Sequence, residues 1–367
     1  MAKTIISADS HITEPPHCYI DYIDAKWKDK APRIIAEDGL SDSFVIDGME
    51  NPIPMGLVAA AGVPPSQRSK EAVVLFDDLH LSGWNAKYRA RDQDKDGIGA
   101  EIIYPTVGMV LCNHNDTEYK QACMLAYNRW LQEFCADEPM RVFGLGQTAV
   151  ISVEQTIKDL REMKGMGFVG VMMPGHPGTD FDYDDSRFNP LWETAIELDF
   201  PLSFHILTTR DTAPVRGQKI NGFMSIIRGC QDVMGVFVFS GVFDRYPDLK
   251  LVCAEADAGW VPHYMYRMDH AYNYHRFWSK VPPLEKMPSE YFRENIAMTF
   301  QDDYIAFQDR DKMNIERLMW ASDFPHSDST WPNSQVVLKE QTDGLTQREK
   351  DLICHDNVKS WYNLPVQ

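Results

Sequence analysis

Ile5-Ile6-Ser7-Ala8-Asp9-Ser10-His11 is a short β-branched run that ends in titratable side chains, and its residues 5–8 are expected to form the first strand. Similar apolar runs recur along the chain, and helix-like patterns separate most of them. Seven further strands are expected at 101–104, 141–145, 168–173, 201–205, 249–255, 295–299 and 317–322. Strands that alternate with helices predict an α/β fold with a parallel sheet. Eight such units predict a (β/α)8 TIM barrel, and a doubly wound sheet is the alternative.

Helix-start signals support this interpretation. Ser152 followed by Gln155 three residues later matches a capping box. Asn189 is an expected N-cap, because Pro190 then takes the first helical position, which proline favours. Further helical patterns are expected at 119–134, 223–243 and 260–274.

Residues 12–96 interrupt the alternation of strands and helices. This stretch fits no single helix and contains several prolines, including two Pro-Pro pairs. We expect it to be an insertion after the first strand that arches over the barrel mouth and covers the pocket. The chain has no low-complexity linker and no fixed-period repeat, so residues 1–367 are expected to form one barrel domain.

Composition narrows the classes of partner. The formal net charge of -18 repels phosphate backbones and argues against nucleic acid. We find no run of roughly 18 apolar residues, so no membrane span is expected. The apolar stretch at the N-terminus is too short for a signal peptide. The 7 cysteines contain no C-x-x-C pair and are expected to be reduced thiols in a cytoplasmic protein.

Polar residues follow several expected strands, and in a barrel the chemistry lies at these carboxyl ends. Asp9 and His11 are two residues apart, so on an extended backbone their side chains point the same way. His205 ends the fifth strand and Asp323 follows the eighth. Each has an ordinary explanation alone, as a core histidine or a turn aspartate. Together, two carboxylates and two imidazoles favour a divalent transition metal: Zn, Mn or Fe.

Several segments resemble the amidohydrolase-related proteins, the branch of the amidohydrolase superfamily that contains aminocarboxymuconate-semialdehyde decarboxylase and resorcylate decarboxylase. The similar segments are 6–16, 96–106, 189–192, 241–250 and 321–326, and they spread over most of the chain outside the insertion. The resemblance implies a barrel with a four-ligand site. In that site, Asp9 and His11 match the first-strand ligands, His205 the fifth-strand ligand and Asp323 the eighth-strand ligand.

Two positions depart from the familiar decarboxylases. Glu255 stands where those enzymes have a histidine after the sixth strand, and it could act as a general base or as a ligand. His326 stands where they usually have an aromatic residue. Glu14, Glu255 and His326 could hold a second ion, of Fe or Mn. Alternatively, His326 orients Asp323 from outside the ligand set.

Other polar residues are weaker candidates. His176 lies in a loop after the fourth strand and could line the pocket, or it could simply be exposed. Arg210 could bind a substrate carboxylate through two hydrogen bonds or form a surface ion pair. His270 and His275 lie in an aromatic stretch that we interpret as a packing or subunit surface.

The leading hypothesis is a metal-dependent hydrolase or non-oxidative decarboxylase that acts on a small carboxylate or aromatic substrate. Glu255 and Asp323 are its candidate catalytic residues, since either could take a proton from water. One alternative is an oxygen-activating hydroxylase with two Fe or Mn ions. Another is a non-catalytic subunit of a hetero-oligomer. A homodimer or a hetero-oligomer is expected in either case.

Overall fold

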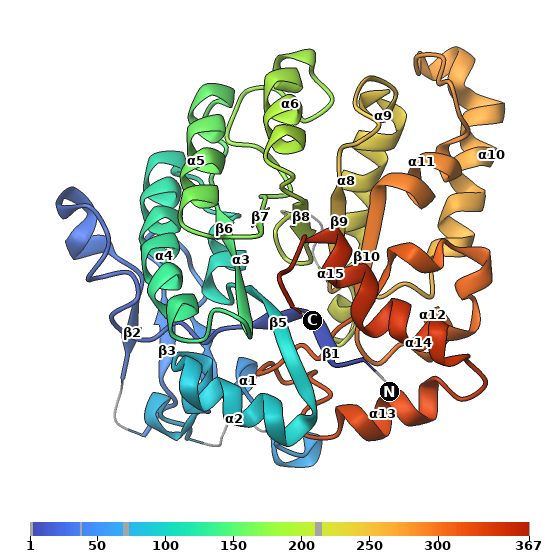
Figure 1. The fold of residues 1–367 in the computed structure, drawn as a ribbon. Helices are drawn as coiled ribbons and strands as arrows, with labels where there is room; N and C mark the ends of the chain where they lie inside the picture. The colour runs from blue at the N-terminus through green and yellow to red at the C-terminus, as the bar shows by residue number, and fades with distance from the viewer. Residues whose placement is uncertain (1–2, 37–38, 69–72, 210–214, 367) are drawn as a thin grey trace.

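A computed structural model describes residues 3–36, 39–68, 73–209 and 215–366, and within them eight parallel strands form one sheet (Figure 1). The strand order is β1-β5-β6-β7-β8-β9-β10-β11. The strands are β1 (Ile5–His11), β5 (Ile98–Tyr104), β6 (Val142–Gln147), β7 (Gly170–Met172), β8 (Leu202–His205), β9 (Leu251–Ala254), β10 (Ile296–Phe300) and β11 (Leu318–Trp320). All eight expected strands are therefore present, and the predicted barrel is confirmed.

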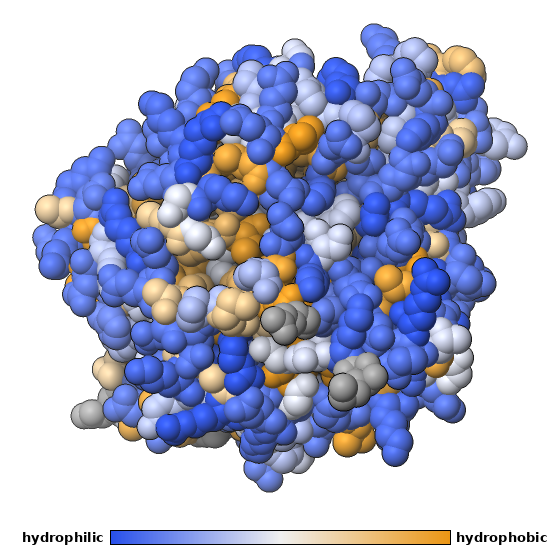
Figure 2. All heavy atoms as spheres, in the orientation of Figure 1, coloured by the Kyte–Doolittle hydropathy of each residue, from blue (hydrophilic) through white to orange (hydrophobic). Residues whose placement is uncertain are grey.

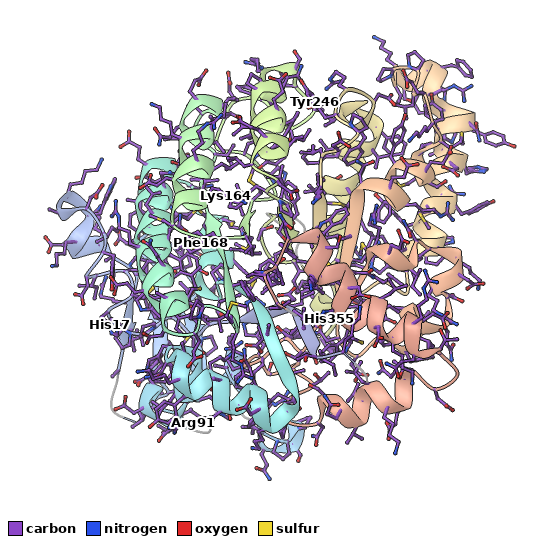
Figure 3. The ribbon with its side chains drawn as sticks, in the orientation of Figure 1. His17, Arg91, Lys164, Phe168, Tyr246 and His355 are labelled. Atoms are coloured by element: carbon purple, nitrogen blue, oxygen red, sulfur yellow. The ribbon has the colours of Figure 1, made fainter. Side chains whose placement is uncertain are left out.

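The two ends of this sheet meet through backbone hydrogen bonds. Asp323 N–H donates to Asp9 O at 3.0 Å, and His11 N–H donates to Phe324 O at 2.7 Å. The ring therefore closes between β1 and the segment that follows β11. The C-terminal segment supports the same strand, because His355 Nδ1–H donates to Thr4 O at 2.6 Å (Figure 3).

Helices follow most strands and cover the outside of the ring (Figure 1). They are α3 (Val107–Leu111), α4 (Thr117–Asp137), α5 (Val153–Gly165), α6 (Asn189–Glu197), α7 (Asn221–Ser225), α8 (Arg228–Phe239), α9 (Val242–Arg245), α10 (Val261–Ser279), α11 (Pro288–Asn295), α12 (Tyr304–Gln308), α13 (Ser334–Gln341), α14 (Gln347–Asp351) and α15 (Asn357–Trp361).

Two helix starts differ in detail from the sequence-based expectation. Ser152 Oγ accepts from Gln155 N–H at 3.1 Å, but the Gln155 side chain donates to Asp159 instead of returning to the cap. Only half of the predicted capping box forms, because a carboxylate one turn away competes for the amide. Asn189 is the first residue of α6 and not its cap, which is Phe188.

The insertion after β1 has regular structure of its own. It contains a small antiparallel sheet and two α-helices: β2 (Arg33–Ile35), β3 (Ser43–Val45), β4 (Ile53–Pro54), α1 (Met55–Val58) and α2 (Ala86–Asp96). Buried Phe44, Met55 and Phe76 belong to the same hydrophobic cluster as the barrel interior, so the insertion has no separate core. Ser327 N–H donates to Val58 O at 2.9 Å, which fixes the insertion against the loop after β11.

One face of the molecule is mostly polar, and one helical stretch of the described chain is notably apolar. Figure 2 shows hydrophilic side chains over most of one face, with hydrophobic ones gathered mainly in its middle. Among the described residues, Asn221–Phe239 is the one helical stretch long and apolar enough to span a membrane, with a mean hydropathy of 1.3 and 28% burial. Length and composition alone are weak evidence for a span, since core helices of other proteins share them.

Candidate metal centre

Five of the predicted residues converge at the carboxyl ends of the strands. His11 Nε2 lies 3.4 Å from Asp9 Oδ1, 3.3 Å from Glu255 Oε2 and 3.4 Å from Asp323 Oδ1. His205 Nε2 lies 3.1 Å from Glu255 Oε2 and 3.6 Å from Asp9 Oδ2. Such spacings bring imidazole nitrogens and carboxylate oxygens around one common point.

Backbone geometry directs two of these side chains inward. Glu255 directly follows β9 with φ 52°, and Asp323 lies after β11 with φ 56°. Non-glycine residues rarely adopt this left-handed conformation, and such strain concentrates at functional sites. The turns end the strands abruptly and aim both carboxylates at the histidines of β1 and β8.

The facing atoms of these side chains lack hydrogen-bond partners. The unpartnered buried atoms include Asp9 Oδ1, His11 Nε2, His205 Nε2, Glu255 Oε2 and both carboxylate oxygens of Asp323. An unsatisfied buried polar atom costs about 1–3 kcal/mol, and a charged one costs more. A shared cation would satisfy so many donor atoms aimed at one point. A mixed nitrogen and oxygen donor set suits Zn, Mn or Fe, so the residues fit the predicted divalent ion.

The charges of the centre perturb one another. The carboxylates of Asp9 and Glu255 raise the pKa of His205 well above its usual value, although burial opposes the shift. Burial and the neighbouring carboxylates of Glu255 and Asp9 raise the pKa of Asp323 well above its usual value. A divalent cation bound here would compete with protons for the same nitrogen and oxygen atoms.

Second contacts fix which nitrogen of each ligand histidine faces the centre. His11 Nδ1–H donates to Pro105 O at 3.0 Å, and His205 Nδ1–H donates to Ile206 O at 3.0 Å. Both imidazoles therefore turn Nε2 toward the centre, where a metal ion could take the place of a proton. Thr299 Oγ1 donates to Asp9 Oδ2 at 2.9 Å and orients that carboxylate.

His326 also directs a lone pair at the centre. Thr106 Oγ1 donates to Ile12 O at 2.6 Å, so it must accept from His326 Nε2–H at 2.9 Å. Burial and the charge of His11 hold the pKa of His326 well below its usual value, so the ring is neutral and its Nδ1 is unprotonated. Nδ1 lies 3.0 Å from Asp323 Oδ1. Two groups of residues could each hold an ion: Asp9, His11 and His205, and His11, Glu255, Asp323 and His326.

Glu14 lies in neither of these two groups. Its Oε1 instead accepts from the backbone N–H groups of Thr106 at 3.0 Å and Gly108 at 3.2 Å. Burial raises the pKa of Glu14 to about 6, although these backbone donors oppose the shift. In this arrangement Glu14 supports the loop after β5.

Arg89, which sequence reasoning missed, connects the two ends of the centre. Its fully buried guanidinium donates to His11 O at 2.7 Å and Phe324 O at 2.9 Å, and its Nε donates to Glu101 Oε2 at 2.5 Å. It thus ties the backbone of a first-strand ligand to the residue after Asp323. An arginine on a polar helix of the insertion carries no sequence signal for this role, because its partners are carbonyl oxygens.

The weaker candidates lie outside the centre. His176 is exposed, and it lines a cavity of about 510 Å³ beside β8 that contains none of the residues of the centre. Arg210 falls outside the described residues. On α10, the His270 ring stacks on Tyr274 at 4.4 Å, and His275 accepts from Trp278 Nε1 at 3.3 Å.

Comparisons with known proteins agree with this geometry. A sequence model of the family described as Amidohydrolase matches residues 78–364. Gamma-resorcylate decarboxylase from Polaromonas sp. is 26% identical over 253 residues, which cover 65% of this chain and 76% of that protein.

Solved structures share the fold across nearly the whole chain. An amidohydrolase from Mycobacterium avium subsp. paratuberculosis K-10 superposes with a TM-score of 0.80 at 20% identity, covering 99% of this chain and 100% of that one. A dihydroxybenzoic acid decarboxylase from Polaromonas sp. JS666, with bound manganese and 2-nitroresorcinol, superposes with a TM-score of 0.67 at 17% identity. The match covers 100% of this chain and 98% of that one.

Proposed function

The chain belongs to the amidohydrolase family, and from that premise we propose that it is a metal-dependent, non-oxidative decarboxylase of an unsaturated or aromatic carboxylic acid. The observation that carries the proposal is the set of buried, unpartnered donor atoms at the strand ends. Decarboxylation is favoured over hydrolysis by the relatives, which include a gamma-resorcylate decarboxylase.

Asp9, His11, His205 and Asp323 would hold the cation. Their side chains are 0–1% exposed, so the ion would be enclosed by protein on that side. Manganese is our first choice, because oxygen and imidazole donors suit it and a structural relative binds it. When bound, a divalent ion supplies Lewis-acid polarisation of a substrate oxygen.

Glu255 is the residue best placed to move a proton. Its side chain is 13% exposed, while the other four side chains are nearly inaccessible, so it lies on the side that a substrate can reach. Glu255 rests as a carboxylate, because the neighbouring His205 and His11 hold its pKa well below its usual value although burial opposes the shift. We propose that Glu255 takes a proton from water on its exposed side and passes it to the carbon that carries the substrate carboxylate. The carbon–carbon bond then breaks, its electron pair returns to the unsaturated system, and CO2 leaves, so Glu255 is again a carboxylate and the hydroxide left from water combines with CO2 as bicarbonate.

Product analysis tests the reaction type. The purified chain, loaded with manganese, is incubated with 2,6-dihydroxybenzoate and with 5-carboxyvanillate in water enriched in ¹⁸O. We expect one CO2 per product and no ¹⁸O in the organic product. A product that carries ¹⁸O from water contradicts decarboxylation and supports hydrolysis. Turnover by the chain alone also contradicts a purely structural role in a hetero-oligomer.

A second candidate, an oxygen-activating enzyme with two metal ions, is favoured by one observation. The unprotonated Nδ1 of His326 faces the same space as Glu255 and Asp323, which leaves donor atoms beyond those that one ion needs. Metal analysis by mass spectrometry, combined with an oxygen electrode, distinguishes the candidates. Two Fe or Mn ions per chain with oxygen consumption support this candidate, while one ion and no oxygen uptake rule it out.

A further inference from the structure

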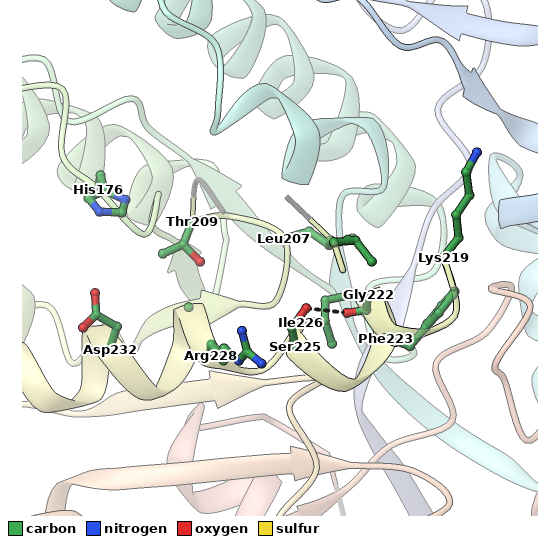
Figure 4. A pocket seen from close by; sticks show the side chains of 12 residues that line it. His176, Leu207, Thr209, Lys219, Gly222, Phe223, Ser225, Ile226, Arg228 and Asp232 are labelled. Carbon is green, nitrogen blue, oxygen red and sulfur yellow. Dashed lines mark hydrogen bonds between the residues drawn. The ribbon is translucent and has the colours of Figure 1, made fainter. Parts of the chain in front are cut away.

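We infer that the substrate has an anionic end and an apolar body larger than one aromatic ring, and that this body binds in the cavity of about 510 Å³ beside β8. The inference rests on the proposed function, because it specifies the substrate class of that same enzyme. Its physical basis is the position, lining, charge and size of the cavity (Figure 4).

The cavity lies next to the proposed ligands along the chain. Its wall includes Leu207, two residues after His205, where a φ of 65° turns the chain out of β8. The opposite wall is the start of α8. The two walls are tightly joined, since a Cβ added at Gly229 would lie 1.6 Å from Thr209 Oγ1. This close approach fixes the spacing between the segment after β8 and the start of α8 at this point of the cavity.

Most of the lining at one end is apolar and incompletely buried. Leu207, Val215 and Phe223 are 43%, 49% and 68% exposed, and Ile226 completes this side. Figure 4 shows Leu207, Ile226 and Phe223 toward one end, and His176 and Asp232 at the other. Covering apolar surface yields roughly 25 cal/mol per Å², so an apolar ligand would be stabilised here.

The charges around the cavity select an anion. Lys219 and Arg228 both line it, and among the described residues neither takes part in an ion pair. Asp232 is the one acidic residue among the described lining residues, so the local balance is positive in a chain whose net charge is -18. Arginine binds carboxylates through paired hydrogen bonds, and Arg228 is therefore the expected anchor for a second anionic group of the substrate, separate from the carboxylate that leaves as CO2.

The size excludes a single ring as the best fit. A cavity of about 150 Å³ is enough to hold benzene in a protein core. The observed volume is more than three times larger, which matches fused rings or a ring with a long side chain. The chemical class is therefore a hydrophobic carboxylic acid of extended shape.

Binding of a fluorescent acid tests the inference without using activity. Metal-loaded protein is titrated with 1-pyrenebutyrate, with neutral 1-pyrenebutanol and with benzoate. We expect 1-pyrenebutyrate to bind at least tenfold more tightly than benzoate. Arg228→Gln should lower the affinity for 1-pyrenebutyrate at least fivefold and change the affinity for 1-pyrenebutanol by less than twofold. Arg216→Gln, outside the lining, is the matched control and should change neither.

Cavity-filling variants locate the bound probe. Ile226→Trp should weaken 1-pyrenebutyrate at least tenfold, while Met224→Trp, on an adjacent exposed residue outside the lining, should stay within twofold. Val215→Trp is the second filling variant should Ile226→Trp fail to fold, because Val215 is half exposed. Equal losses in Ile226→Trp and Met224→Trp, or benzoate as tight as the pyrene acid, would overturn the inference.

The experiments can contradict this inference and the proposed function independently of each other. Titration after removal of metal by a chelator should leave the pyrene affinity within threefold, since the cavity provides most of it. Loss of pyrene binding after removal of the metal would show that the metal centre provides the affinity. That result would contradict the inference, while decarboxylation could still be observed. Pyrene binding without CO2 release from any acid tested would retain the cavity and reject the decarboxylase.

Discussion

The guanidinium of Arg89 lies among acceptors from both ends of the chain. Removing it leaves Glu101 as a buried charge without its partner, which costs about 3–5 kcal/mol. Arg89→Met should lower the free energy of unfolding by about that amount in urea denaturation. Arg91→Met on the same helix is the control, because Arg91 is exposed (Figure 3), and should stay within about 0.5 kcal/mol. A loss below about 1 kcal/mol for Arg89→Met contradicts its bridging role.

Glu14 gives the stability a pH dependence with a definite sign. Its pKa is about 6 in the folded chain against 4.5 as its ordinary value, so the folded state keeps the proton longer. Stability is thus fully present below about pH 4.5 and falls as the pH rises to about 6, by roughly 2 kcal/mol. Glu14→Gln should avoid this loss and be more stable than the parent at pH 7.5.

The measurement compares unfolding free energies of both proteins at pH 4.5 and 7.5. The gain should nearly vanish at the lower pH, where Glu14 is protonated in the folded state and about half protonated in the unfolded state. Glu118→Gln, at an exposed position in the first turn of α4, is the control and should show no such difference. An equal gain in unfolding free energy at both pH values would mean that Glu14→Gln acts through packing and not through the titration of Glu14.

The ligands were predictable as single residues, while the groups that position them were not. Asp9, His11, His205 and Asp323 lie at or just after the carboxyl ends of largely apolar strands, and the barrel brings such strand ends together. Thr106 and Arg89 act through backbone carbonyl oxygens. Any residue supplies a carbonyl, so no pattern of residue types marks these contacts in a sequence.

At the scale of elements, apolar runs located the eight strands, but some of their ends moved. β1 extends to His11, three residues beyond the expected 5–8, because Asp9, Ser10 and His11 are buried and Ser10 and His11 pair again with β5 after an irregularity in the register. The regular structure of the insertion escaped prediction, since β4 spans only Ile53–Pro54 and α1 only Met55–Val58. Elements this short depend on tertiary contacts rather than on sequence periodicity.

Two glycines of the insertion allow a test of how the insertion packs against Trp331. Gly62 and Gly39 have φ of 75° and 79°, so alanine is strained at both. At Gly62 a Cβ would also lie 2.7 Å from Trp331 Cζ3, whereas nothing lies within 4 Å at Gly39. We expect Gly39→Ala to cost about 1–2 kcal/mol and Gly62→Ala about 1–3 kcal/mol more. Equal losses of stability for the two variants in thermal denaturation would show that the Trp331 side chain moves aside at no cost and does not fix the insertion.

At the scale of the molecule, the cation should contribute directly to stability. A ligand that binds only the folded state adds about 4 kcal/mol at a concentration 1,000 times its Kd. Removal of metal with a chelator should lower the melting temperature, and added Mn²⁺ should restore it. Asp9→Asn combined with His11→Gln should abolish the response to Mn²⁺. A melting temperature that is unchanged by chelation contradicts a resident ion.

We propose that the chain forms a homodimer through α10. Tyr266, Tyr274, Phe277 and Trp278 are 60–78% exposed on this helix. Together they offer roughly 600 Å² of aromatic surface, close to the roughly 800 Å² per partner of a standard interface. Light scattering after gel filtration should give twice the chain mass, and Phe277→Glu with Trp278→Glu should halve it. Tyr304→Glu, on α12, should leave the mass unchanged, and a monomeric parent contradicts the proposal.

The donor set of the metal centre draws on residues near both termini, since Asp9 and Asp323 are 0–1% exposed neighbours of the same histidine. During synthesis on a ribosome, the first ligands emerge more than 300 residues before the last. A nascent chain therefore has an incomplete ligand set until Asp323 has been translated. Any truncated translation product that ends before β11 should fail to retain the ion, so metal retention reports that synthesis has passed β11.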